Sequence, residues 1–161
     1  MAIVVETGSG TDQNANSYVS ESELTEYTTD RGITLTGTAS VLLIKAMDYL
    51  ETLTYRGNRT LETQPLSWPR EEVFLDSIEL DKNTIPTQLK RAQMTLAVEL
   101  DSGNDPLSSL DQAVKREQAG PVEVEYMDNS YSGTILRSVD AQLRDLILNS
   151  GGFGNIHVGR G

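Results

Sequence analysis

The 161-residue sequence contains no cysteine, only one histidine and only one tryptophan. The absence of cysteine excludes disulfides, thiolate metal sites and thiol catalysis. No apolar run approaches the roughly 20 residues of a membrane-spanning helix. The first residues also lack the basic start and long apolar stretch of a signal peptide. We therefore expect a protein that is made in the cytosol and has no membrane partner.

Apolar and aromatic residues are scarce as well. They make up 37% and 6% of the chain, respectively, which is enough for one small core. Apolar surface that so small a core leaves uncovered is commonly buried against other subunits. This composition favours a component of an assembly over a self-contained enzyme.

Basic residues are outnumbered by acidic ones. The chain has 13 lysines and arginines against 24 aspartates and glutamates, which gives a net charge of −11. Such a charge repels a phosphate backbone and disfavours tight sequence-independent DNA binding. The adjacent basic pairs, Lys90-Arg91 and Lys115-Arg116, fall on predicted helices and are expected to form solvated faces.

Residues that carry out catalysis are poorly placed in this sequence. The only histidine, His157, lies in a glycine-rich tail without packed neighbours to orient it as a general base. The oxygen-rich run from Asp101 to Asp105 lacks the alternation and the distal glutamate of a calcium loop. The glycines at 8–10 and 151–154 lack the lysine of a phosphate-binding loop. We therefore predict no enzymatic activity, no cofactor and no metal.

Helical periodicity recurs along most of the chain. Ser20 and Glu23 have the spacing of a capping box ahead of a short helix. Apolar residues at helical spacing predict a second helix, and Pro86 suits the first turn of a third that ends near Gly103. Ser138 is expected to cap the last helix, which Gly151 ends. The predicted helices cover residues 21–30, 39–55, 86–103, 107–118 and 138–151.

Two segments depart from this pattern. Residues 60–69 contain two prolines and Trp68, and are expected to form a loop or an extended crossing. Apolar and acidic residues alternate from Val122 to Tyr126, which predicts a half-buried strand. Its edge either faces water or joins a sheet completed by neighbouring protomers. Trp68 more often anchors a core or an interface than stacks on a base. The candidates for an inter-subunit or core role are Trp68, Val122, Val124 and Tyr126.

These elements predict a mainly α fold. We expect a small bundle of four to five helices with a short β-strand or hairpin excursion near residues 121–136. Residues 1–150 would form the domain, with extended N- and C-terminal arms. Residues 151–161 would form a flexible, glycine-rich C-terminal tail.

Several short motifs give the sequence a family resemblance up to about Tyr126. Their order and spacing resemble tailed-phage neck proteins called DnaT-like single-stranded DNA-binding proteins, which group with the helical head–tail connector or adaptor proteins. The motifs are Val5-Glu6-Thr7-Gly8, Ala15-Asn16-Ser17-Tyr18-Val19-Ser20, Ala46-Met47-Asp48-Tyr49-Leu50, Leu66-Ser67-Trp68-Pro69-Arg70, Ile85-Pro86, Leu89-Lys90-Arg91-Ala92, and the passage from Lys115 to Tyr126.

The resemblance implies a structural adaptor at the head–tail interface of a virion, made in the host cytoplasm. Such proteins form rings, usually dodecamers, that bind the portal protein and the next neck or tail-completion protein. They serve tail assembly and DNA ejection, and an acidic ring would let DNA pass through its lumen without specific binding. The portal-contact candidates near the C-terminus are Leu143, Leu146, Ile147, Phe153, Ile156, His157, Val158 and Arg160.

A single-stranded DNA-binding accessory protein is the alternative. Such proteins combine a positive groove with aromatic side chains on which bases stack. The six tyrosines, two phenylalanines and one tryptophan show no cluster in the sequence, so this function ranks second. A small phage hydrolase ranks third, because no nucleophile–base pair stands out.

Overall fold

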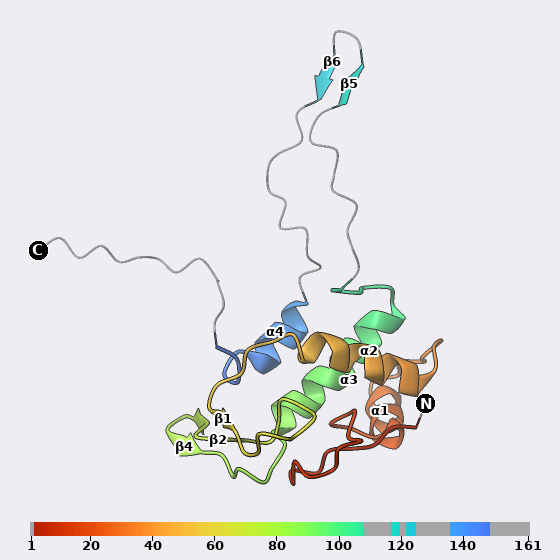
Figure 1. Cartoon of the computed structure of the whole chain (residues 1–161). Coiled ribbons are helices and arrows are strands. Elements are labelled where there is room, and N and C mark those ends of the chain that lie inside the picture. The colour runs from red at the N-terminus through yellow and green to blue at the C-terminus, as the bar shows by residue number, and fades with distance from the viewer. Residues whose placement is uncertain (1, 108–116, 120–121, 125–135, 149–161) are drawn as a thin grey trace, which may run out of the picture.

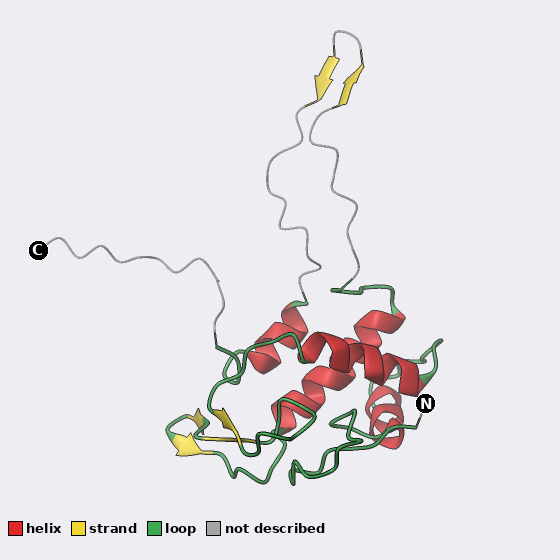
Figure 2. Cartoon of the chain, viewed as in Figure 1, coloured by secondary structure: helices red, strands yellow, loops and turns green. Residues whose placement is uncertain are grey.

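In the part of the chain that the structure describes, the fold consists of four helices and three short strand pairs (Figures 1 and 2). The computed structural model describes residues 2–107, 117–119, 122–124 and 136–148. The helices are α1 (Glu21–Thr29), α2 (Ala39–Leu50), α3 (Thr87–Asp101) and α4 (Arg137–Leu143). The predicted mainly α class is correct in part, because short antiparallel strands accompany the helices.

Each strand pair is antiparallel and short. The pairs are β1 (Asn58–Arg59) with β2 (Arg70–Glu71), β3 (Phe74–Leu75) with β4 (Ile78–Glu79), and β5 (Glu117–Ala119) with β6 (Val122–Val124). The predicted strand is confirmed for Val122–Val124, while Tyr126 lies outside the described residues.

The prediction of a helix over residues 107–118 is wrong at its C-terminal end. Glu117–Ala119 form strand β5, whose backbone pairs with β6. This pairing satisfies backbone groups that a helix would satisfy within itself. Residues 108–116, the rest of that predicted helix, lie outside the described residues.

Helix α3 is the central helix and contacts α1, α2 and α4. Its buried residues follow the helical period and include Leu89, Gln93 and Leu96. The apolar stripe predicted for α2 is also confirmed, because Leu43, Ala46, Met47 and Leu50 are buried. Among the described residues, no helix combines the length and the apolar character needed to cross a membrane.

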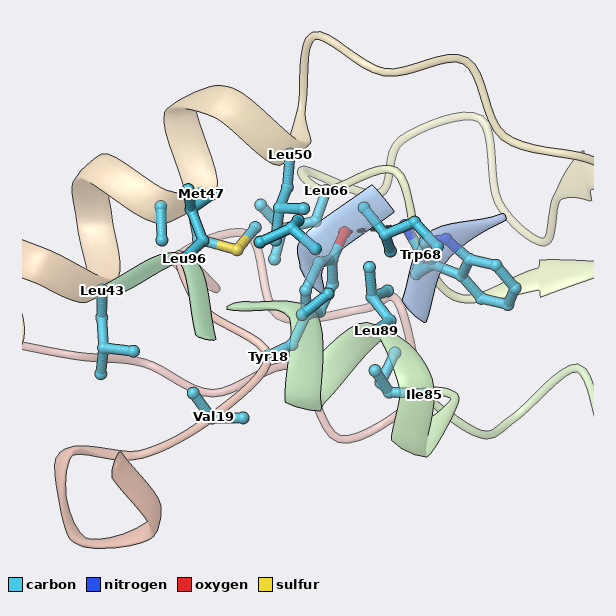
Figure 3. Close-up of a cluster of buried hydrophobic side chains, with 14 of the residues drawn as sticks. Tyr18, Val19, Leu43, Met47, Leu50, Leu66, Trp68, Ile85, Leu89 and Leu96 are labelled. Atoms are coloured by element: carbon cyan, nitrogen blue, oxygen red, sulfur yellow. Dashed lines mark hydrogen bonds between the residues drawn. The ribbon is translucent and has the colours of Figure 1, made fainter. Parts of the chain in front are cut away.

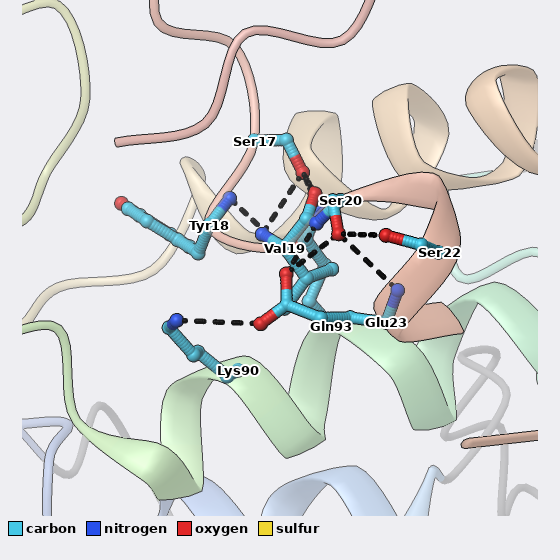
Figure 4. A network of polar contacts seen from close by, with 8 residues as sticks. All are labelled: Ser17, Tyr18, Val19, Ser20, Ser22, Glu23, Lys90 and Gln93. Atoms are coloured by element: carbon cyan, nitrogen blue, oxygen red, sulfur yellow. Dashed lines mark hydrogen bonds and ion pairs between the residues drawn. The ribbon is translucent and has the colours of Figure 1, made fainter. Parts of the chain in front are cut away.

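The predicted capping box at α1 is confirmed. The Ser20 hydroxyl accepts a hydrogen bond from the Glu23 amide at 3.2 Å, and the Ser20 amide donates to the Glu23 carboxylate at 2.7 Å. The same carboxylate lies 3.6 Å from the Lys90 ammonium of α3 (Figure 4). The cap therefore also ties α1 to the central helix.

Helix α2 ends at Leu50, five residues before its predicted end at Tyr55. Beyond Glu51, the backbone leaves the helix and pairs with the segment that follows α4. The Arg56 amide donates to the Leu146 carbonyl at 2.9 Å, and the Leu148 amide donates to the Thr54 carbonyl at 2.8 Å. A long-range pairing therefore overrides the local helical pattern.

The same pairing shortens the last helix. Helix α4 spans only Arg137–Leu143, with Leu136 at the N-cap position, so Ser138 lies inside the first turn and is not the cap. After α4, a turn closes at Ile147, whose amide donates to the Leu143 carbonyl at 3.0 Å. The chain is then in position to meet residues 54–56.

The N-terminal segment folds back on itself instead of extending as an arm. The Glu6 amide donates to the Ser17 carbonyl, and the Asn16 amide donates to the Val4 carbonyl. The Glu6 carboxylate is buried and accepts hydrogen bonds from the amides of Gly8 and Gly10 at 2.7 and 3.0 Å. This segment leads directly to Tyr18, which is completely buried.

Candidate functional site

A buried polar network fixes the crossing that contains Trp68. The Glu51 carboxylate, just after α2, accepts hydrogen bonds from the Tyr18 hydroxyl at 2.9 Å and from the amide and hydroxyl of Ser67 at 3.0 and 2.8 Å. The Tyr18 oxygen in turn accepts the Trp68 amide at 3.2 Å (Figure 3). Burial, reinforced by the Glu51 charge, raises the pKa of Tyr18 well above its ordinary value, so the hydroxyl remains a donor.

Gln93 of α3 holds the other end of this network. Its side-chain carbonyl accepts the Tyr18 amide at 3.0 Å, and its amide donates to the Ser17 hydroxyl at 2.8 Å (Figure 4). The same amide donates to the Leu43 carbonyl at 3.3 Å. The motifs around Tyr18 and Trp68 thus meet in the interior. Their residues stabilise the scaffold.

Trp68 belongs to the core. Its side chain is fully buried among apolar neighbours (Figure 3). It packs edge-to-face against Tyr55, with ring centroids 6.0 Å apart. Of the two roles that the sequence left open for it, the structure shows the core position. A ring without exposed surface has no face to offer a base.

Arg70 links the crossing to strand β1. Its guanidinium donates to the carbonyls of Arg56, Ser67 and Tyr55 at 2.7, 3.2 and 3.3 Å, and also to the carbonyl of Gly57. These acceptors are neutral, so they orient the guanidinium without cancelling its charge. Burial and the nearby Arg59 cation both lower the pKa of Arg70 from its ordinary value.

Two further arginines, on or beside the same strand pair, are exposed to solvent. Arg59 lies opposite Arg70 in the β1–β2 register, and Arg56 immediately precedes Gly57. Both side chains are exposed; the only side-chain hydrogen bond of Arg56 among the described residues runs from its Nε to the Ile147 carbonyl at 3.1 Å. We call Arg59 of β1, Arg70 of β2 and Arg56, two residues before β1, the arginine ribbon.

The arginine ribbon is a local exception to the acidic charge of the chain. Residues 52–70 contain three arginines against one glutamate, which leaves a local charge of +2 in a chain of −11. Within the described part of the chain, none of the three arginines forms an ion pair, whereas Lys90 and Arg144 each lie beside a carboxylate. The three guanidinium groups therefore remain available to an anionic ligand, although Glu71 lies in the same strand pair.

The family comparison decides how this site is read. The whole chain, residues 1–161, matches the model of a family described as "Putative DnaT-like ssDNA binding protein". The chain belongs to this family. No curated protein and no solved structure matches it.

This match corrects the predicted identity. The DnaT-like family is described by single-stranded DNA binding, and nothing in the match indicates a phage head–tail connector. The predicted neck adaptor, its dodecameric ring, its portal and tail-completion partners and the passage of DNA without binding are therefore wrong. The physical reason is visible in the structure: the motifs around Tyr18 and Trp68 meet in the core, so these two motifs report a scaffold and not a partner.

The residues that the sequence predicts to contact a portal fall into two groups. Leu143 and Leu146 pack inside the core at 1% and 0% exposure, and Ile147 is half-buried where it pairs with Tyr55. The others lie outside the described residues, namely Phe153, Ile156, His157, Val158 and Arg160. Val122 and Val124 lie in β6.

Sequence reasoning missed the arginine ribbon. It considered adjacent basic pairs, whereas Arg56, Arg59 and Arg70 are separated by up to 14 residues and come together through strand pairing. The count of carboxylates gives no distinct signal for this segment, because residues 31–47 and 82–98 contain none, whereas residues 52–70 contain one. Of the basic pairs, Lys90 contacts Glu23, while Lys115-Arg116 lies outside the described residues.

Proposed function

We propose that the protein binds single-stranded DNA through the arginine ribbon. The observation that carries this proposal is that Arg59 and Arg70 face each other on one short strand pair, with Arg56 just before it, and that none of the three has an ion-pair partner among the described residues. The family description supports it, because it names single-stranded DNA binding. In this proposal, the exposed arginines outweigh the net negative charge, which had disfavoured DNA binding in the sequence analysis.

Arg56 and Arg59 are the proposed phosphate contacts. Their exposed guanidinium groups present several N–H donors in a planar fork that fits phosphate oxygens. Arg70 is the positioning residue, because its donors are directed at backbone carbonyls of the ribbon. The proposed scaffold beneath it is a small helical bundle centred on α3.

The acidic remainder of the chain limits where DNA is bound. Carboxylates repel phosphate over a Debye length of about 8 Å at physiological salt, so the ribbon is favoured over other surfaces. Few phosphates are then neutralised, and binding is expected to be weak and strongly dependent on salt.

We further propose that the protein acts by binding and not by catalysis. The family description names a ligand and no reaction. The localisation, predicted from the sequence as synthesis in the host cytoplasm and presence in a virion, stays a prediction and is not needed for the proposed binding.

Replacing both exposed arginines tests this function. We expect the double variant Arg56→Ala/Arg59→Ala to lose at least tenfold in affinity for a fluorescently labelled oligothymidylate at low salt. The slope of log K against log salt should fall by roughly 0.7 for each lost phosphate contact. Fluorescence anisotropy across a salt series measures both quantities.

A double variant with the same change in charge is the control. Lys45 and Arg91 are exposed on α2 and α3, away from the ribbon, so Lys45→Ala/Arg91→Ala also removes two positive charges. We expect this control to bind nearly as the unmodified protein does. Equal losses in both variants would show that only net charge matters, and absence of binding by the unmodified protein would refute the proposed function.

A further inference from the structure

We propose that Phe74 stacks on a base of the DNA strand whose phosphates contact the arginine ribbon. This inference rests on the proposed function and adds to it the group that holds the nucleobase. Proteins that bind single strands without sequence preference pair cationic side chains with aromatic platforms, because every base has a π face. The ribbon supplies cations, and the adjacent hairpin supplies an aromatic ring.

Phe74 is the most exposed aromatic side chain in the described part of the chain. It is 53% exposed, whereas Tyr18, Tyr55 and Trp68 are at most 3% exposed. The ring of Tyr27 is covered by the Arg31 guanidinium, which lies 3.6 Å from the ring centroid. A large apolar ring left in water, without a covering side chain, is available to a ligand.

The hairpin places Phe74 close to the arginines. Strand β3 begins at Phe74, three residues after Glu71 ends β2. Even a fully extended chain puts the Phe74 backbone within about 14 Å of Arg70. A strand of a few nucleotides therefore spans both features.

The ring is presented by a well-fixed piece of backbone. Val73, the residue before it, is completely buried, and its carbonyl accepts the Leu80 amide at 2.8 Å. The β3–β4 turn is held by Asp76 and Ser77, both in the left-handed region with φ of 50° and 68°. Non-glycine residues with this backbone conformation are uncommon, and such strain often accompanies functional segments. Because the backbone of Phe74 is already fixed, little conformational entropy of the backbone is lost when a base stacks on its ring.

The charges of the hairpin give the bound strand an orientation. Glu79 lies opposite Phe74 in the β3–β4 register, and Asp76 occupies the turn. An open hollow of about 460 Å³ beside the hairpin is lined by three carboxylates against one ammonium, namely Glu71, Glu72, Glu79 and Lys82, together with Leu80. These carboxylates repel phosphate but not an uncharged base. The backbone of the strand is thus directed to Arg56 and Arg59, and a base to Phe74.

Substitutions at Phe74 test the stacking contact directly. We expect Phe74→Ala to weaken binding of an oligothymidylate by about 5- to 150-fold, and Phe74→Trp to retain it. The salt slope should not change in Phe74→Ala, because no phosphate contact is removed. An oligonucleotide carrying the fluorescent base 2-aminopurine should be quenched by the unmodified protein and by Phe74→Trp, and not by Phe74→Ala.

Ile78→Ala is the matched control on the same hairpin. Ile78 is 72% exposed and apolar but not aromatic, so its loss should leave affinity and quenching unchanged. Thermal unfolding followed by circular dichroism checks that every variant folds. If Phe74→Ala binds as tightly as the unmodified protein while Arg56→Ala/Arg59→Ala does not, the stacking inference is overturned and the proposed function stands. If the unmodified protein binds no oligonucleotide, both fail.

Discussion

The helical part of the molecule and the segment from Glu51 to Pro86 are stabilised in different ways. In α2 and α3, apolar residues at helical spacing bury one face and the backbone satisfies itself. In residues 51–86, single polar side chains satisfy several backbone groups each. Gln64, for example, donates to the carbonyls of Leu66 and Pro69 and accepts the Leu61 amide.

This difference has a consequence for substitution. A helix position tolerates many residues of suitable size and polarity, because the periodic pattern determines its place. A loop held by Glu51, Gln64 and Arg70 has no such redundancy, because each lost side chain leaves several backbone groups without a partner. The exposed Arg56 and Arg59 lie in this loop, so their positions depend on those few side-chain hydrogen bonds. The predictions below test this contrast, beginning with the largest expected effect.

Gly57, which lies between Arg56 and β1, has no room for a Cβ atom. Its φ is +69°, and a Cβ added there would lie 2.3 Å from the Glu71 carbonyl oxygen and 2.6 Å from a Val73 methyl. Gly57→Ala therefore combines left-handed strain with a clash against backbone. We expect a loss of about 3 kcal/mol in the free energy of unfolding, measured by urea titration.

Gly32 provides the control for Gly57. It follows α1 with a nearly equal φ of +64°, but nothing lies within 4 Å of a Cβ added there. Gly32→Ala should cost about 1 kcal/mol from strain alone. Equal losses at the two positions would contradict the close packing at the ribbon.

Asp101 connects the end of α3 to the start of α2, and its contribution to stability should depend on pH. Its carboxylate accepts hydrogen bonds from the amides of Thr36 and Gly37, just before α2, at 2.9 and 2.7 Å. The bond from the Thr36 amide is the largest cause of a lowered Asp101 pKa. A lowered folded-state pKa stabilises the fold above the unfolded-state pKa of about 3.9, and this contribution is lost as the pH falls through the folded-state value.

Asp101→Ala should therefore lower Tm at pH 6, and the difference from the unmodified protein should shrink below about pH 4. Melting curves followed by circular dichroism at several pH values measure this difference. Asp48→Ala is the control, because Asp48 is exposed on α2 and its side chain makes no hydrogen bond among the described residues. A difference in Tm that is constant across the pH range would rule out the carboxylate as its source.

The smallest effect is expected at the β3–β4 turn, with the opposite sign. Ser77 has a φ of 68°, a conformation that glycine adopts readily. Ser77→Gly should raise the free energy of unfolding by roughly 0.5 kcal/mol, since relief of strain exceeds the added entropy of the unfolded chain. Ser102→Gly is the control, because Ser102 has an ordinary φ of −79° and should gain nothing. Denaturant titration of both variants decides the point.

The helices were predictable because their information is local. The capping box at Ser20 and the apolar stripe of α2 can be read within a dozen residues. Their ends were less predictable, because Tyr55 leaves its helical pattern to pair with Ile147, 92 residues away in the chain. No local rule reports such a partner.

The candidate site was even less accessible to sequence reasoning. Arg59 and Arg70 become neighbours only through strand pairing, and Trp68 lies between two prolines without a pattern that reveals its burial. The net charge pointed away from DNA because it averages over regions that differ in sign. Charge counting along the sequence does not single out residues 52–70 either, because residues 82–98 contain three basic residues and no acidic one.

The hydrogen bond between Tyr18 and Gln93 also sets an order of events during synthesis. The two residues are 75 positions apart, so the ribosome adds Gln93 roughly 4 to 15 seconds after Tyr18. During that interval, the beginning of the polypeptide lacks the side chain that will hold it. The first residues to be made are thus among the last to take their final place, and a nascent chain halted before α3 would expose Tyr18 and Val19 to chaperones and proteases.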